Sequence, residues 1–215
     1  MIKYSKLSNH QLKKILRCFC SDLTATQTSK ILGLNRNTIN RYYLLFRSKI
    51  VLYQDSINKE FKGEIELDES YFGGRNKGRR GRGTAKIPVF GILKRNGRVY
   101  TQIIKNASRA QIRPIINRLV HKKSTLYTDK WWAYYGLAFN GYKHYRINHS
   151  KEEYSDCKGT HINGIEAFWS YAKRRLIRFN GIPRKDFYLH LKECEFRYNE
   201  KDRIFEKMIN ILKIF

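Results

Sequence analysis

Hydrophobic positions in the first fifty residues recur with the spacing of amphipathic helices. After Ser8, a residue type that favours helix N-termini, the i, i+3, i+4, i+7 pattern is followed by Leu12, Ile15, Leu16 and Phe19. The segment TATQTSKILGLNRNTINRYYLLFRSK then predicts a short helix that ends at Gly33 and a longer helix that begins around Asn35. Two helices joined across such a turn are typical of a helix-turn-helix.

The second of these helices is predicted to carry residues that contact DNA. Ile39 would pack underneath it, and Ser29 is the small residue where the two helices cross. The side chains expected on its outer face are of types that read base edges and hold phosphates: Arg36, Asn37, Asn40 and Arg41. A helical hairpin that serves only for packing is the alternative interpretation.

A change of hydrophobic period marks a second domain. We interpret residues 51–61 as a linker between a helix-turn-helix domain, 1–50, and a domain that spans 62–215. Over residues 64–68 acids alternate with aliphatic residues, so one strand face would be acidic and the other apolar. Two further strand-like runs, IPVFGILK and RVYTQIIK, are separated by Arg95-Asn96-Gly97, and Asn-Gly between apolar runs is a strong hairpin signal.

The remaining elements complete an α/β order. SRAQIRPIINRLVH predicts an amphipathic helix capped by Ser108, STLYTD a strand, KWWAYYGLAF an aromatic helix and YKHYRINH a further strand. A helix from Asn163 and a C-terminal helix over about 186–199 follow. The order β-β-β-α-β-α-β-α predicts an α/β fold of the ribonuclease-H-like type, a mixed sheet with helices on its faces.

The charge of the chain indicates its class of partner. Its 215 residues carry a formal net charge of +26, which is typical of proteins that bind nucleic acid, whereas 41% hydrophobic residues indicate a packed core. No apolar run approaches the ~20 residues of a membrane span, and we expect no membrane partner. The four cysteines show no CxxC spacing, so we expect neither a disulfide framework nor a zinc ribbon. These features favour a reduced, cytoplasmic protein.

Three acids fall where this topology converges. Asp68 follows a strand-like run, Asp129 ends another and Glu166 begins a helix. Each also has an ordinary structural interpretation: an exposed strand residue, a helix N-cap, and a capping box with Asn163, respectively. Taken together, the three carboxylates suit two divalent metal ions held over a phosphodiester, and Mg²⁺ or Mn²⁺, without zinc, is the expected cofactor.

Basic residues adjoin these acids. Lys173 lies two turns after Glu166 on the same helix face, where its ammonium would meet a DNA phosphate; a solvated lysine is the alternative. His161 and Asn163 are further candidates to assist the acids. The residues expected to follow the DNA backbone lie in the glycine-rich loop after Asp68 and in the same helix: Lys77, Arg79, Arg80, Arg82 and Arg174.

Several long blocks resemble one family of proteins. LDESYFGGRNKGRRGRGT, TLYTDKWWAY, INHS, HINGIEAFWSYAKRRL and HLKECEFRYN resemble the IS1595-type insertion-sequence transposases with the ISXO2-like domain, and the IS1016 subgroup is the most similar. The likeness covers roughly residues 62 to 200. It implies a DDE-type transposase with a ribonuclease-H-like core, in which Asp68, Asp129 and Glu166 form the triad and Lys173 is the associated basic residue. Many such proteins carry an N-terminal zinc ribbon, which this chain lacks.

The sequence therefore predicts an enzyme that binds double-stranded DNA at the inverted repeats of its element. It would cut there and join the ends to target DNA, working as a homodimer or higher oligomer at the bacterial nucleoid. One alternative is an inactive, transposase-derived DNA-binding regulator. Another is a ribonuclease-H-like nuclease or resolvase, which cuts without joining.

Overall fold

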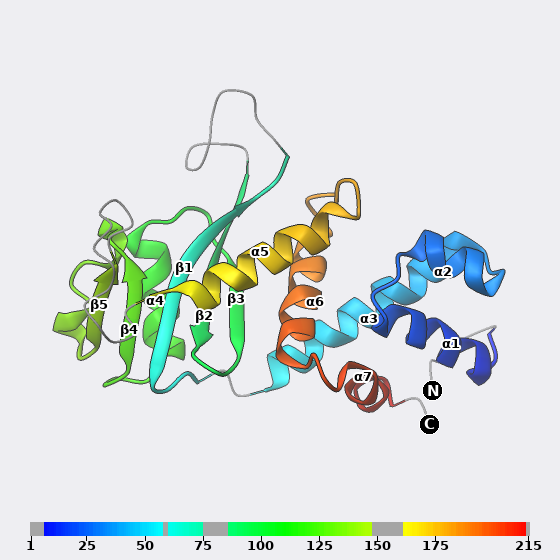
Figure 1. Ribbon diagram of the computed structural model, residues 1–215, viewed down its shortest axis with the longest axis horizontal. Coiled ribbons are helices and arrows are strands. Elements are labelled where there is room, and N and C mark those ends of the chain that lie inside the picture. The colour runs from blue at the N-terminus through cyan, green and yellow to red at the C-terminus, as the bar shows by residue number, and fades with distance from the viewer. Residues whose placement is uncertain (1–6, 58–59, 75–85, 148–160, 214–215) are drawn as a thin grey trace. The chain divides into compact units, whose positions relative to one another are not determined.

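A computed structural model describes residues 7–57, 60–74, 86–147 and 161–213 (Figure 1). By its contacts the chain divides into two units, residues 1–57 together with 182–215, and residues 58–181. Within the described ranges no helix is both long and apolar enough to cross a membrane.

The regular secondary structure of the first unit is all helical in its described residues. Its helices are α1 (Asn9–Cys20), α2 (Ala25–Leu32), α3 (Arg36–Ser56), α6 (Phe187–Asn199) and α7 (Ile204–Leu212). Ser8 and Thr24 each form a capping box with the glutamine three residues later, and Gly33 ends α2 in the left-handed conformation with φ of 65°. The helices predicted on either side of Gly33 are thus confirmed.

Helix α3 extends further than the sequence pattern indicated. The residues expected to begin the linker, 51–56, are helical, because Ile50 and Gln54 are still buried one and two turns beyond Phe46. The segment 182–215, expected within the second domain, lies instead with the N-terminal helices, where α7 was not predicted at all. Helix α7 buries Met208 and Leu212 in the same apolar cluster as Ile15, which explains why it forms.

A buried ion-pair network joins α6 to α1 and α3. Glu193 accepts from Arg47 Nε at 2.7 Å and from Arg197 Nε at 2.8 Å, and Arg197 also donates to the carbonyl oxygens of Phe19 and Cys20. Lys192 pairs with Glu195 at 2.7 Å. Buried charges are tolerated only when they are paired and hydrogen-bonded, so this network ties α6 to one arrangement of the N-terminal helices.

The second unit contains a five-stranded mixed sheet in the order β3-β2-β1-β4-β5. The strands are β1 (Glu64–Phe72), β2 (Ile87–Lys94), β3 (Val99–Ile103), β4 (Thr125–Asp129) and β5 (Lys143–Ile147). The first three form an antiparallel meander, and β4 and β5 are parallel to β1. This topology confirms the predicted ribonuclease-H-like α/β fold.

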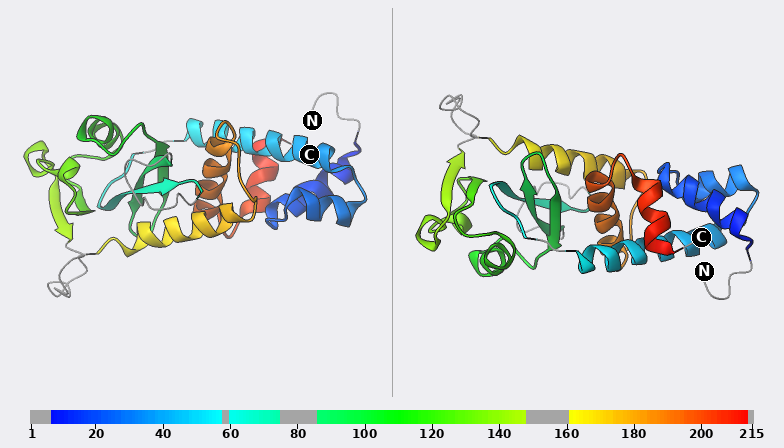
Figure 2. Two further views of the ribbon diagram at one scale, coloured as in Figure 1. Left: turned by 90° about the horizontal axis from the view of Figure 1, so that it is seen from above. Right: turned by 90° about the horizontal axis from the view of Figure 1, so that it is seen from below.

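Two helices cover the two faces of this sheet (Figure 2). Helix α4 (Arg109–Leu119) packs with Ile65 and Leu67 in the main apolar cluster, on the aliphatic face of β1. Helix α5 (Asn163–Ile177) contacts β1 and β2 on the opposite face, which carries Glu66 and Asp68. The alternation predicted for β1 therefore decides which helix meets the acids.

The aromatic segment after β4 does not form the predicted helix. It folds as two 3₁₀ turns, η1 (Trp132–Tyr134) and η2 (Ala138–Asn140). Gly136 and Gly141 follow these turns with φ of 79° and 82°, and this left-handed conformation interrupts a helix. Tyr134 and Leu137 are nevertheless buried in the main apolar cluster, as expected for a segment rich in large apolar side chains.

Gly91 and Glu66 dock α5 onto the sheet. A Cβ atom built on Gly91 would lie 2.5 Å from Cζ2 of Trp169 and 2.9 Å from Cδ1 of Ile165, so only glycine fits under the helix. Glu66, which is 1% exposed, accepts from the Ile165 N–H at 2.8 Å. A carboxylate from β1 thus caps α5, and the predicted Asn163 cap is wrong, since α5 has no side-chain cap of its own.

Replacing Gly91 is expected to displace α5. Gly91→Ala should lower the free energy of unfolding by about 1–3 kcal/mol, because the added methyl group overpacks against Trp169. Gly74→Ala is the matched control, since a Cβ atom there meets nothing within 4 Å. Urea denaturation followed by tryptophan fluorescence measures both, and equal stability of the two variants would contradict this account of the docking.

The ion-pair network predicts a second stability effect. Glu193→Ala should cost about 3–5 kcal/mol, because it leaves the guanidinium groups of Arg47 and Arg197 buried without their shared carboxylate. Glu206→Ala removes an exposed carboxylate from the first turn of α7 and should cost no more than about 1 kcal/mol. Thermal unfolding of both variants tests the difference.

Candidate active site

Asp68, Glu69 and Asp129 form a cluster on two neighbouring strands. One carboxylate oxygen from each lies within 4.8 Å of the other two. Asp68 lies in the middle of β1 and Asp129 closes β4; the parallel β1–β4 ladder, which pairs Glu66 with Tyr127, brings these two positions next to each other just beyond the paired residues. The structure therefore brings together two of the three predicted acids.

Asp68 is held in an environment that disfavours its charge. Burial raises the pKa of Asp68 to about 7, and the negative charges of Asp129 and Glu166 add to this effect. Trp169 of α5 donates its indole N–H to Asp68 Oδ2 at 3.1 Å and so holds the carboxylate in place. The same ring packs over Gly91, which stands opposite Asp68 in the β1–β2 register.

Asp129 stabilises a turn with its side chain and also contributes a carboxylate oxygen to the cluster. Its Oδ1 accepts from the Trp131 backbone N–H at 2.9 Å, so it initiates a turn in place of the helix cap that was its alternative interpretation. Trp131 in turn donates its ring N–H to the Ala107 carbonyl at 3.0 Å, which anchors the chain after Asp129 to the residues before α4. The side chain of Asp129 is half-buried.

Glu69 was not predicted as a site residue. Strand alternation assigns it to the face opposite Asp68, so sequence spacing gave no reason to group the two. In the folded structure Glu69 nevertheless groups with Asp68 and Asp129. It lies beside the hydroxyl of Tyr134, a fully buried residue of η1. The pKa of Tyr134 is raised well above its ordinary value by burial and then by the charges of Glu69, Asp68 and Asp129. The Tyr134 phenol therefore stays protonated near these three acids.

Glu166 and Lys173 lie on α5, the helix that covers this face of the sheet. Glu166 is exposed in the first turn and is not part of the cluster within 4.8 Å, although its charge contributes to the raised pKa of Asp68. Lys173 lies with its Nζ 5.8 Å from the ring centroid of Phe72, at the end of β1. Burial lowers the pKa of Lys173, an effect that the charge of Asp68 opposes.

His161 lies just before α5 and is not part of the acid cluster. His161 Nδ1 is 3.7 Å from Glu66 Oε1, and its carbonyl accepts from Arg95. Arg95 also donates to Glu66 at 3.0 Å and stacks 3.7 Å above the Tyr127 ring. These contacts link the residues before α5 to β1. Asn163 is exposed at the first residue of α5.

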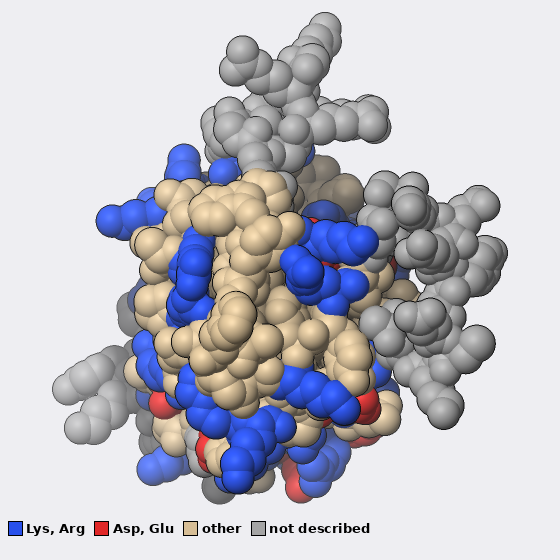
Figure 3. All heavy atoms as spheres, turned by 90° about the vertical axis from the view of Figure 1, so that its left-hand side faces the viewer, with Lys and Arg blue, Asp and Glu red and all other residues tan. Residues whose placement is uncertain are grey.

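The residues predicted to contact DNA divide into two groups. Four are exposed in the first two turns of α3, namely Arg36, Asn37, Asn40 and Arg41, and Arg174 is exposed on α5. The other four, Lys77, Arg79, Arg80 and Arg82, lie outside the described residues. The β4–β5 end of the second unit is also basic: Figure 3 shows lysine and arginine side chains around an uncharged centre, with few acids.

The donor set at the cluster fits a hard divalent cation. All three groups offer carboxylate oxygens, which Mg²⁺ and Mn²⁺ prefer, and no cysteine or histidine belongs to the set. Three carboxylates this close repel one another without a counter-charge; the pKa of Asp68 is raised mainly by burial and further by the charge of Asp129.

Comparisons with known proteins identify the family. The family model of the ISXO2-like transposase domain matches residues 60–199. An uncharacterized transposase-like protein of Haemophilus influenzae is 42% identical over 116 residues, which are 54% of this chain and 91% of that protein. The assignment to the IS1016 subgroup stays a prediction.

Solved structures with some likeness include two complexes of Mos1. The Mos1 strand transfer complex has a TM-score of 0.33 and 12% identity over 97% of this chain and 78% of the other. The Mos1 mariner paired end complex with Mn has a TM-score of 0.35 and 9% identity over 97% and 79%. TM-scores this low establish only a distant likeness. The sequence matches suffice: the chain belongs to the ISXO2-like transposase domain family.

Proposed function

We propose that this protein is a DDE-type transposase that binds the inverted repeats of its own insertion sequence, cuts DNA there and transfers the ends to target DNA. The observation that carries this proposal is the cluster of Asp68, Glu69 and Asp129 on adjacent strands of a transposase-family domain. A regulator without catalysis would have no use for acids gathered at such an electrostatic cost.

Asp68 and Asp129 are proposed to hold Mg²⁺ or Mn²⁺, with Glu69 or Glu166 as the third ligand. When bound, a pair of such ions activates the attacking oxygen and stabilises the leaving oxygen of a phosphodiester. Glu166 is the residue that the family resemblance implies, and Glu69 is the one that lies within 4.8 Å of the two aspartates.

The other residues position the acids and the DNA. The indole N–H of Trp169 and the backbone N–H of Trp131 orient Asp68 and Asp129, respectively. Lys173, beyond Glu166 on α5, is proposed to contact a phosphate of the strand being cut. The exposed residues at the start of α3 are proposed to bind the element ends, aided by the net charge of +26.

Removing a metal-binding carboxylate should abolish cleavage and spare binding. Asp68→Asn and Asp129→Asn should each lower nicking of labelled element-end DNA in Mg²⁺ by at least about 100-fold, since several kcal/mol of transition-state stabilisation is lost. Gel-shift affinity for the same DNA should stay within a few-fold. Asp202→Asn, which removes an exposed carboxylate of the other unit, is the control.

The same assay distinguishes the remaining possibilities. Of Glu69→Gln and Glu166→Gln, the variant that loses cleavage identifies the third ligand. Binding without cleavage in any metal would favour the regulator, and cleavage without strand transfer would favour a nuclease. Near-normal nicking by Asp129→Asn would overturn the proposed site.

The raised pKa of Asp68 predicts a pH-dependent stability. Its pKa is 3.8 in the unfolded chain and about 7 in the fold, so stability of the metal-free protein is lost as the pH rises between these values. In EDTA, the free energy of unfolding of Asp68→Asn, relative to that of the wild type, should therefore increase between pH 4 and pH 8 by on the order of 2–4 kcal/mol. Adding Mg²⁺ should stabilise the wild type more than the variant, because a bound cation favours the ionised carboxylate. Thermal unfolding curves measure both effects; parallel pH profiles would contradict them.

A further inference from the structure

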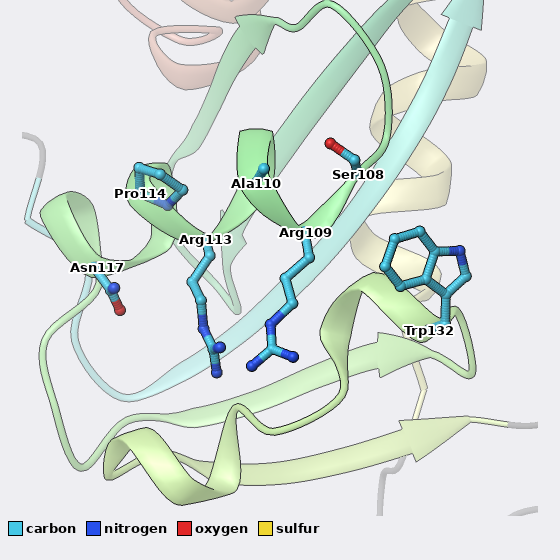
Figure 4. A pocket seen from close by; sticks show the side chains of 7 residues that line it. All are labelled: Ser108, Arg109, Ala110, Arg113, Pro114, Asn117 and Trp132. Atoms are coloured by element: carbon cyan, nitrogen blue, oxygen red, sulfur yellow. The ribbon is translucent and has the colours of Figure 1, made fainter.

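A pocket whose lining includes Trp132, three residues after Asp129, is not used by the proposed cleavage reaction. It has a volume of about 610 Å³ and lies between the start of α4 and η1. Its lining residues are Ser108, Arg109, Ala110, Arg113, Pro114, Asn117 and Trp132 (Figure 4). None of these seven is acidic, and two are arginines one turn apart on α4.

The two guanidinium groups converge on Gly136. Figure 4 shows the side chains of Arg109 and Arg113 extending side by side from α4. A Cβ atom on Gly136 would lie 3.3 Å from Arg109 Nη2 and 3.5 Å from Arg113 Nη2, and Gly136 has a φ of 79° that favours glycine. Glycine at this position therefore leaves space for both cations.

The guanidinium groups of Arg109 and Arg113 have few hydrogen-bond acceptors among the described residues. Arg113 Nη2 donates to the Gly136 carbonyl at 2.8 Å. Arg109 makes no hydrogen bond or ion pair with any residue in the described ranges. The pKa of Arg113 is lowered by burial and then by the positive charge of Arg109, which records the repulsion between them. An anion placed between them would relieve that repulsion and accept from both guanidinium forks.

An exposed aromatic ring completes the pocket. Trp132 is 48% exposed, whereas its neighbour Trp131 is fixed by its hydrogen bonds to Asp129 and Ala107. The two rings lie 5.5 Å apart between centroids, at an angle of 57°. Trp132 is thus held three residues from Asp129, with much of its ring open to a planar partner.

We infer that this pocket binds one unpaired nucleotide of the DNA strand that passes the acids, its base stacked on Trp132 and its phosphate between Arg109 and Arg113. A pocket of this size suits a single nucleotide and not a duplex. Only a base that has left the duplex stack offers its face to a tryptophan. This inference rests on the proposed function, since it assumes that DNA reaches Asp129.

The test compares tailed with blunt DNA. A duplex with a short single-stranded tail containing 2-aminopurine is titrated with the protein, and its anisotropy and 2-aminopurine fluorescence are recorded. Wild type should bind the tailed duplex more tightly than the blunt one and quench the probe. Arg109→Ala and Trp132→Ala should each lower affinity for the tailed duplex by about tenfold or more and leave the blunt duplex unchanged. Trp132→Phe should retain most of the quenching.

Matched controls lie close by. Phe139, 97% exposed on η2, does not line the pocket, so Phe139→Ala should bind tailed DNA as the wild type does. Arg98→Ala removes an exposed arginine from the β2–β3 hairpin and should likewise keep the preference for the tail.

The outcomes separate this inference from the proposed function. If the wild type cuts element-end DNA but the pocket variants bind tailed DNA normally, the nucleotide site is overturned and the transposase is not. A free mononucleotide that competes as well as the tailed duplex would overturn the assignment to DNA. If the wild type binds neither duplex, both proposals fail.

Discussion

The docking of α5 onto the sheet is the interaction on which the candidate site depends. Gly91 removes the side chain that would collide with Trp169, Glu66 caps the helix from β1, and the Trp169 indole then reaches Asp68. One contact surface thus sets the position of α5 and the orientation of a catalytic candidate. The same helix carries Glu166 and Lys173, so their position relative to Asp68 follows from that docking as well.

The site is built against an electrostatic penalty. Three carboxylates lie together over a buried phenol, and the pKa of Asp68 is raised to about 7. Such an arrangement is favourable only with a counter-charge, and a divalent cation supplies one. In the same unit, Arg109 and Arg113 present the opposite case, two like positive charges beside an open pocket. In the proposed function, the acids would bind cations and the two arginines would bind a phosphate of the DNA.

One sequence block that resembles transposases has a structural role. HLKECEFRYN contains Glu193, Glu195 and Arg197, whose side chains belong to the buried network with α1 and α3. Glu66, two residues before Asp68, likewise serves as a cap for α5. A motif that marks a family therefore mixes residues for chemistry with residues that hold helices in place.

The sequence by itself determined the five strands, most of the helices and two of the acids. Alternation in β1, the Asn-Gly hairpin and the capping signals are local, so they predicted the sheet, the faces of β1 and the first helices, and with them Asp68 and Asp129. Only the tertiary structure decided the rest. Glu69 joined the cluster through packing near Tyr134, the α5 cap came from a strand 99 residues earlier, and 182–215 lay with the N-terminal helices. Each depends on contacts between segments far apart in the chain, and local hydrophobic periodicity carries no information about such contacts.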